Sequence, residues 1–335
     1  MRQLSFAFLV LFLAGCTAPA PDTTPKIRLQ VSRAGLLGLL GVDSTYLVSA
    51  DGSGATMADL PPDLGDAPRW SPDGEWIAFY NRAFGSGRGS LYLMRFDGRD
   101  RREIRLPQQD AREPTWSPDS MSLAYTDYAL DYDHNVFSSR IRVIGVACYR
   151  RGEDCQPESR VLTEGHLPDW SPDGQRIVYT HVTDPYSIHV LSISVDGTSP
   201  PVDLTPHLKE CFDPPRWSPN GEKIVFSCDD AIYTPNDDAI YTINADGSGL
   251  TMLTQPGDTP TWSPDGKQIA FVSTRDGLGK CLISYYGTDG GGCEDSEALF
   301  LMNQDGSHVI RLSQRNDEVV DEYTWLPTKQ THTRR

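Results

Sequence analysis

Short apolar segments alternate with polar turns along most of the chain, and one arrangement of the two recurs. Its first copy, PRWSPDGEWIAFY, places Trp70 before a Ser-Pro-Asp-Gly turn and an apolar run after that turn. Proline presets φ at the second turn position, aspartate can bond the nearby backbone, and glycine takes the positive φ that follows. The pattern predicts a strand, a tight turn and a second strand.

Related units return at intervals of roughly 45 to 65 residues, which is the period range of a propeller blade. After the second strand, each unit continues with a third apolar segment, usually an Asp-Gly turn, and a fourth segment. Asp119-Ser120 and Asn220-Gly221 show that the first turn tolerates change, as a scaffold does. The repeated tryptophan therefore marks blade structure, at Trp70, Trp116, Trp170, Trp217, Trp262 and, in a truncated copy, Trp325.

The two ends of the repeat region complement each other. Material before Trp70 resembles strands two to four of a unit, whereas Trp325 has a first strand with nothing comparable after it. We predict an all-β, six-bladed β-propeller of four-stranded antiparallel blades over residues 27–327, followed by a C-terminal tail, 328–335. Pairing of the C-terminal strand with the N-terminal blade would close the ring and remove an exposed sheet edge.

The WSPDG-x-x-[IL]-[AV]-[FY] units and their Asp-Gly turns resemble the WD-like repeats of TolB-like six-bladed propellers. The resemblance covers about Ile27 to Pro327 and implies the fold. The same repeat serves periplasmic scaffolds, caps of peptidases and some sugar-acting enzymes, so it does not specify a function. TolB itself carries an N-terminal α/β domain where this sequence has only a short tether, so TolB's own partners are not expected here.

The N-terminus has the pattern of an export signal. MRQLSFAFLVLFLAGC contains a positive charge near its start and an apolar run too short to span a bilayer. Its end resembles the bacterial lipobox, which implies acylation of Cys16. We predict a lipoprotein signal peptide at 1–15 and a lipid-anchored tether rich in proline and threonine at 16–26. The chain would be exported and anchored to a bacterial membrane, in the periplasm or at the cell surface; the alternative is an ordinary signal peptide with an incidental cysteine.

The six remaining cysteines form three local couples, each around a turn or loop. The first couple flanks a hairpin-like turn, the second lies almost symmetrically about a Pro-Asn turn, and the third brackets a glycine-rich loop. We expect three disulfides, each stapling one hairpin or loop, as is usual outside the reducing cytosol. Free thiols or a metal site are the alternatives, and the lack of CxxC spacing disfavours metal. The pairs are Cys148–Cys155, Cys211–Cys228 and Cys281–Cys293.

Charge limits the class of partner. The formal net charge is −16 and the sequence pI is about 4.8. Nucleic-acid binding relies on cationic groups that neutralise phosphates, so nucleic acid is not expected as a partner. Basic proteins, cations and neutral glycans stay open, and an acidic surface also serves solubility alone.

Loop lengths predict which face of the propeller binds. Tight, uniform turns would emerge on one face, whereas the long, dissimilar loops would emerge on the other, where binding residues concentrate. Carboxylates there could hold Ca²⁺ and tyrosines could contact a protein or a sugar, although no EF-hand spacing occurs. Solvated loop charge and local packing are the alternatives. The candidates are Tyr128, Asp131, Asp133, Asp230, Tyr233, Asp238, Tyr285 and Tyr286.

Catalysis has little support in the sequence. It contains no GxSxG, HExxH or P-loop motif, so no catalytic, cofactor or metal residue is predicted. We expect a monomeric, non-catalytic binding scaffold for a protein or a cell-envelope component such as a glycan. The alternative is a carbohydrate-active or small-molecule enzyme with an acidic site at the channel mouth, because paired carboxylates that meet in space leave no local signature.

Overall fold

The computed structural model describes residues 26–33, 44–49, 56–57, 66–82, 89–106, 110–131, 136–153, 155–184, 187–208, 210–229, 238–275, 280–281, 293–294, 298–313 and 318–325. The predicted signal peptide at 1–15, Cys16 and the C-terminal tail at 328–335 lie outside these ranges, as does the predicted tether apart from its last residue. No helix within the described ranges is long and apolar enough to cross a membrane.

Five four-stranded antiparallel sheets follow one another from β4 to β25. The first contains β4 (Asp66–Trp70), β5 (Trp76–Arg82), β6 (Gly89–Arg95) and β7 (Arg102–Glu103). The second contains β8 (Ala111–Trp116), β9 (Ser122–Asp131), β10 (Val136–Gly145) and β11 (Ser159–Glu164), with the one-turn helix α1 (Ala147–Arg150) between β10 and β11. The third contains β12 (His166–Trp170), β13 (Arg176–Asp184), β14 (Ser187–Ser194) and β15 (Val202–Asp203).

The fourth sheet contains β16 (Arg216–Trp217), β17 (Lys223–Cys228), β18 (Ala239–Asn244) and β19 (Thr251–Thr254). The fifth contains β20 (Asp258–Trp262), β21 (Gln268–Ser273), β24 (Ala298–Asn303) and β25 (Ile310–Arg311). Between β21 and β24, the short strands β22 (Lys280–Cys281) and β23 (Cys293–Glu294) pair with each other.

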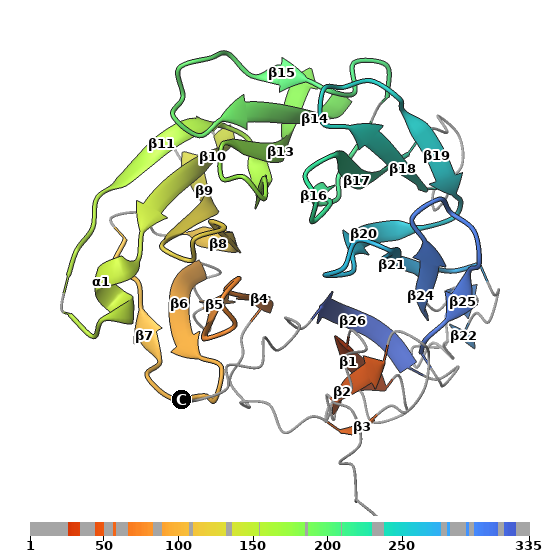
Figure 1. Ribbon diagram of the computed structural model, residues 1–335, viewed down its shortest axis with the longest axis horizontal. Helices are drawn as coiled ribbons and strands as arrows, with labels where there is room; N and C mark the ends of the chain where they lie inside the picture. The colour runs from red at the N-terminus through yellow and green to blue at the C-terminus, as the bar shows by residue number, and fades with distance from the viewer. Residues whose placement is uncertain are drawn as a thin grey trace, which may run out of the picture.

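A further four-stranded sheet joins the two ends of the described chain. β26 (Glu318–Trp325) pairs antiparallel with β1 (Lys26–Arg33), which pairs with β2 (Ser44–Ser49), which in turn pairs with β3 (Thr56–Met57). Figure 1 shows the sheets arranged around one axis, with β4, β8, β16, β20 and β26 nearest to it. The molecule is an all-β propeller of four-stranded antiparallel blades.

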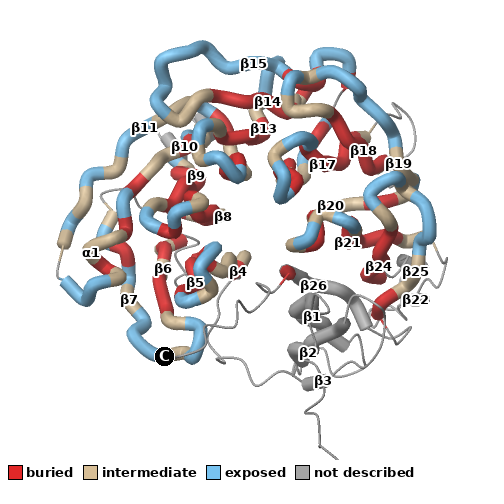
Figure 2. The backbone as a smooth tube through the Cα atoms, in the orientation of Figure 1, coloured by how far each residue is buried: buried red, intermediate tan, exposed pale blue. Residues whose placement is uncertain are grey.

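The core lies between neighbouring blades. Leu91 and Leu93 of β6 share one buried cluster with Leu123 and Tyr125 of β9 in the next blade. Figure 2 shows buried residues concentrated in the middle strands and exposed residues along the outer strands β11, β15 and β19. Each blade therefore buries its apolar faces against its neighbours, because a single sheet cannot cover both of its own faces.

The predicted strand-turn-strand unit is confirmed, and a serine fixes its turn. In the first copy, the Ser71 hydroxyl donates to Asp73 at 2.6 Å and accepts the Trp76 N–H at 2.9 Å. Gly174 takes φ 72° at the last turn position, and Ser120 takes φ 60° at the corresponding position of its copy. The structural role of the tryptophan is also seen directly, since Trp116 donates its indole N–H to a backbone carbonyl of the preceding blade at 2.9 Å.

Two of the three predicted disulfides are confirmed, Cys148–Cys155 and Cys211–Cys228. The first differs from the prediction in its setting. Cys148 lies in helix α1 rather than on a hairpin strand, because the chain after β10 turns into one helical turn that buries Tyr149. Cys281 and Cys293 occupy directly opposed positions of β22 and β23. Their side chains lie outside the described part, so that disulfide stays a prediction.

Candidate functional site

A cavity of about 260 Å³ opens where the innermost strands reach their WSPDG turns. Its walls come from β4, β12, β16, β20 and β26, which are far apart in the sequence. Figure 1 shows four of them, β4, β16, β20 and β26, around the propeller axis. We call this the turn-face mouth of the channel. Because it lies at the tight-turn end of the inner strands, it is on the face opposite to the long loops. The residues that matter for its chemistry are Arg69, Asp169, Arg216, Trp217, Trp262 and Trp325.

Asp169 supplies the carboxylate in the described wall of the turn-face mouth, and both of its oxygens accept hydrogen bonds from within the protein. One oxygen accepts the Trp217 N–H at 2.9 Å and the other accepts the Thr115 hydroxyl at 3.3 Å. Burial raises the pKa of Asp169, and the nearby Arg216 guanidinium opposes that rise. Arg216 Nη1 lies 3.7 Å from Asp169 Oδ1. These two charges therefore offset each other across adjacent blades.

Arg69 is the second guanidinium in the wall of the turn-face mouth. It is partly exposed. In the part of the chain that the structure describes, its side chain forms neither a hydrogen bond nor an ion pair. Arg69 does lower the pKa of Asp169 through charge, so the two groups lie within electrostatic range of each other. Among the described residues of its wall, the mouth thus has two guanidinium groups and one carboxylate.

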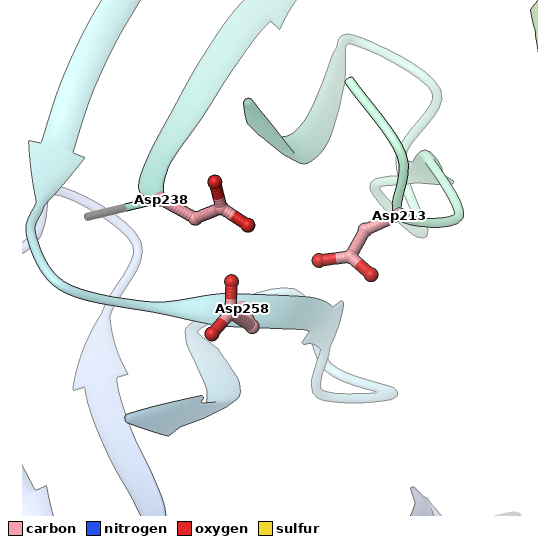
Figure 3. Close-up of side chains that lie close together, drawn as sticks. All are labelled: Asp213, Asp238 and Asp258. Atoms are coloured by element: carbon pink, nitrogen blue, oxygen red, sulfur yellow. The ribbon is translucent and has the colours of Figure 1, made fainter. Parts of the chain in front are cut away.

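Three carboxylates meet at the opposite, long-loop end of the fourth and fifth sheets, near the starts of β16, β18 and β20. Asp213, Asp238 and Asp258 each offer an oxygen within 4.8 Å of the others. Figure 3 shows their carboxyl groups pointing toward one another from three separate segments. Burial raises the pKa of Asp238, and the negative charges of Asp213, Asp229 and Glu210 add to the rise. Such an oxygen set has the chemistry to hold a hard cation such as Ca²⁺.

The acid cluster also has a structural use. Asp213 Oδ2 accepts the Thr259 N–H of the next blade at 2.9 Å and the Ser227 hydroxyl at 2.5 Å. Thr259 has φ 48° and begins a bulge in β20, where the pairing register with β21 shifts. The bulge turns its N–H away from the ladder, and the carboxylate of the neighbouring blade accepts it.

A similar device joins the second and third blades. Leu167 has φ 56° and donates its N–H to Thr126 Oγ1 of the preceding blade at 3.1 Å. Thr126 in turn donates its hydroxyl to Glu113, whose pKa is raised by burial. Inner-strand bulges therefore couple adjacent blades through polar side chains. Sequence reasoning missed them because each left-handed residue is an ordinary amino acid before a proline, which by itself favours extended backbone.

The predicted loop residues have different outcomes. Asp238 is a member of the acid cluster, together with Asp213 and Asp258, which were not predicted. Tyr128 donates its hydroxyl to Glu113 at 3.0 Å and its ring lies under Arg112. Asp131 is the last residue of β9, opposite Val136. The other candidates, Asp133, Asp230, Tyr233, Tyr285 and Tyr286, lie outside the described residues.

Sequence reasoning also missed the turn-face mouth, although one signal pointed to it. Arg69, Asp169 and Arg216 all occupy the position just before the repeated tryptophan, where the other copies have threonine. That position varies in charge while the residues on both sides of it are nearly constant. A variable site inside a uniform repeat indicates side chains that face a shared space, here the channel.

Comparison with known proteins identifies the fold. The family model described as the TolB beta propeller domain matches residues 158–294. The crystal structure of TolB from Acinetobacter baumannii is similar over 91% of this chain and 67% of its own, with a TM-score of 0.62 and 16% identity. The fold is that of a TolB-like β-propeller. No curated protein matches the sequence significantly.

Two further structures share this TolB-like propeller. The putative TolB from Agrobacterium tumefaciens is 19% identical, with a TM-score of 0.57, over 91% of this chain and 99% of its own. The hydrazine synthase of Kuenenia stuttgartiensis is 12% identical, with a TM-score of 0.59, over 91% of this chain and 47% of its own. This chain therefore spans about half the length of the synthase chain that it matches. At these identities the likeness concerns the fold, and the function has to be argued from the site.

Proposed function

We propose that this chain is a lipid-anchored, extracytoplasmic binding platform for a protein or a cell-envelope component, built on a closed six-bladed propeller. The antiparallel pairing of β26 with β1 supports the closed ring. The TolB-like fold is consistent with a binding scaffold. The platform would act without catalysis, by presenting fixed side chains to a ligand.

The observation that carries this proposal is the turn-face mouth. It is a concave site on the propeller axis whose wall combines guanidinium groups with tryptophan and proline side chains. Apolar walls with a few placed polar groups are typical of ligand sites, and arginine and tryptophan are enriched where proteins bind other molecules. The apolar side chains of the mouth therefore supply contact area for a ligand, and its polar groups fix the orientation of that ligand.

The frame around the mouth is held by contacts between blades. Trp217 and Trp262 are 7% and 6% exposed, so most of each ring packs between neighbouring blades and only a small part of it lines the mouth. Asp169 ties its blade to the next through the Trp217 N–H. Side chains fixed in this way lose little conformational entropy when a ligand binds, which favours recognition.

Export and anchoring are supported by the cysteines. Two disulfides occur in the described part, as expected outside the cytosol. The sequence ahead of the propeller resembles a lipobox that ends at Cys16. Lipid on Cys16 would hold the propeller near a membrane through the proline-rich tether.

The long-loop face is a second candidate surface within this proposal. Asp238 supports it, because this predicted residue belongs to an acid cluster at the base of the loops. A basic protein or a cation would suit that end of the channel, whereas the turn-face mouth has an excess of guanidinium groups. The two ends of the channel would thus recognise ligands of opposite charge.

Chemical crosslinking in living cells, followed by mass spectrometry of the purified chain, tests the platform role. We expect one partner or envelope component to be captured reproducibly, and a Cys16→Ser form to leave the membrane fraction. A Cys16→Ser form that stays in the membrane would contradict lipid anchoring. Capture of no partner, together with turnover of a glycan panel by the purified protein, would favour the enzyme alternative.

A further inference from the structure

We infer that the turn-face mouth binds a carboxylate group of its ligand, and that Arg69 is the residue that receives it. This inference rests on the proposed function, since it names the chemistry that the platform recognises there. Arg69 lines the cavity, is partly exposed, and has no hydrogen bond or ion pair within the described part of the chain. A guanidinium presents several N–H donors in a planar fork that matches the two oxygens of a carboxylate.

The charges around Arg69 favour an anion. Arg216 and Asp169 face each other at 3.7 Å, and Asp169 further accepts the Trp217 N–H at 2.9 Å. The only carboxylate in the described wall is therefore already occupied by donors from the two neighbouring blades. Arg69 lies within electrostatic range of Asp169 without contacting it, so one cationic group in the wall is left for a ligand.

The setting of Arg69 differs from that of many arginines in this acidic chain. Arg95, Arg112 and Arg142 are each paired with an aspartate at 3.0 Å or less. With a net charge of −16, carboxylates are abundant on the surface as partners. Arg69 lines the cavity without pairing with any of these carboxylates in the described part of the chain. Its guanidinium is therefore better suited to bind a carboxylate of a ligand than one of this chain. The overall negative charge would also repel free anions at low ionic strength, so the local site has to provide the affinity.

The volume of the turn-face mouth limits how much of a ligand can enter it. A cavity of about 260 Å³ is smaller than the usual range for drug-sized ligands, so it would admit a single residue or sugar ring. A carboxylate of this kind is offered by the C-terminus of a peptide or by an acidic sugar. Both sources present a carboxylate to Arg69. Probes that represent each source, each compared with its uncharged counterpart, can show which one binds.

Calorimetric titration of the full-length protein with two matched pairs tests the inference. One pair is acetyl-Gly-Gly-Gly with a free C-terminus and the same peptide as its amide; the other is galacturonic acid and galactose. We expect at least one acid to bind and its neutral partner to bind at least tenfold more weakly. Preference for the peptide acid would identify a protein partner, and preference for the uronic acid would identify an envelope glycan.

Two variants and a control make the test specific to the mouth. Arg69→Gln should weaken binding of the acid by about tenfold or more, because it removes the charge and the fork. Asp169→Asn should strengthen it severalfold, because it releases Arg216 from its counter-charge while Asn Oδ1 still accepts the Trp217 N–H. A gain of affinity cannot come from misfolding. Arg99→Gln, an equal charge change at an exposed turn, should leave binding unchanged.

The inference is overturned if neither acid binds at tens of millimolar, if acid and neutral probes bind equally, or if Arg69→Gln retains full affinity. These outcomes are separate from the platform test. Discrimination of acids without capture of any partner in cells would keep the carboxylate site and contradict the platform role. Capture of a partner in cells, with acid and neutral probes bound equally, would support the platform role and contradict the carboxylate site.

Discussion

At the scale of single residues, Ser171 shows what fixes the repeated turn. Its hydroxyl donates to Asp173 at 2.6 Å and accepts the Arg176 N–H at 2.9 Å, and the side chain is buried. The fourth copy has asparagine at the aspartate position, and Asn220 Oδ1 accepts the Ser218 hydroxyl at 2.7 Å in the same way. The turn therefore needs the serine and an acceptor two residues later, and the acceptor need not be charged.

Ser171→Ala should lower the free energy of unfolding by about 1–2 kcal/mol, because the partly buried Arg176 N–H loses its acceptor. Asp173→Asn should change it by less than about 0.5 kcal/mol at pH 7. Urea titrations of the two variants and the parent measure both effects. Equal losses in the two variants would show that the aspartate charge, rather than the serine, holds the turn.

His166 provides a pH-dependent contribution to stability. Burial lowers the pKa of His166 to about 4, and the neighbouring His181 adds to the shift. A histidine whose pKa is lower in the folded state favours the neutral form there. Its contribution is therefore complete above the ordinary pKa of about 6.5 and is lost as the pH falls toward 4.

His166→Gln should remove this part of the pH dependence. Between pH 7.5 and pH 4.5 the parent should lose up to about 3 kcal/mol more stability than the variant, measured by urea unfolding at both pH values. Replacement of the exposed His207 by glutamine is the matched control and should leave the pH dependence of the parent intact. A His166→Gln variant that loses as much stability as the parent would contradict the assignment.

At the scale of elements, helix α1 connects two blades at the turn face. Arg150 of α1 donates to the Ser120 carbonyl and to the Asp73 carboxylate, which lie in the first turns of adjacent blades. The Cys148–Cys155 disulfide closes the loop that contains this arginine. The disulfide and the arginine contacts should therefore depend on each other.

A double-mutant cycle measures that dependence. Replacement of Cys148 and Cys155 by serine should cost about 2 kcal/mol, from the freedom regained by the unfolded loop. Arg150→Met should cost about 1–2 kcal/mol in the parent and clearly less in the serine background, where α1 is no longer held in place. Strict additivity in urea unfolding would show that the arginine holds its position without the disulfide.

The elements also show which features were predictable from the sequence. The blade strands and the turn after Trp70 could be predicted because apolar periodicity, proline and glycine act locally. Helix α1 could not, since one helical turn around Tyr149 has no period of its own. The inner-strand bulges at Leu167 and Thr259 were also unpredictable, because their left-handed backbone is stabilised by partners in another blade.

At the scale of the whole molecule, sites arise where separate blades meet. Arg69 and Arg216 are almost 150 residues apart, roughly three blade periods, and reach one cavity only because the sheets surround a common axis. The acid cluster of Asp213, Asp238 and Asp258 arises in the same way at the other end. Asp238 was predicted from its loop, whereas the other two could be found only once the inner strands were in place.

The central claim is that recognition occurs at the turn-face mouth of the channel. Site-specific photo-crosslinking in cells tests it most directly, with a benzophenone amino acid at Pro219, an exposed residue that lines the mouth. The control position is Val202, which is 47% exposed on the outer strand β15. We expect one partner to be captured from Pro219 and not from Val202. Capture from Val202 alone, or from neither position when chemical crosslinking does find a partner, would contradict recognition at the turn-face mouth.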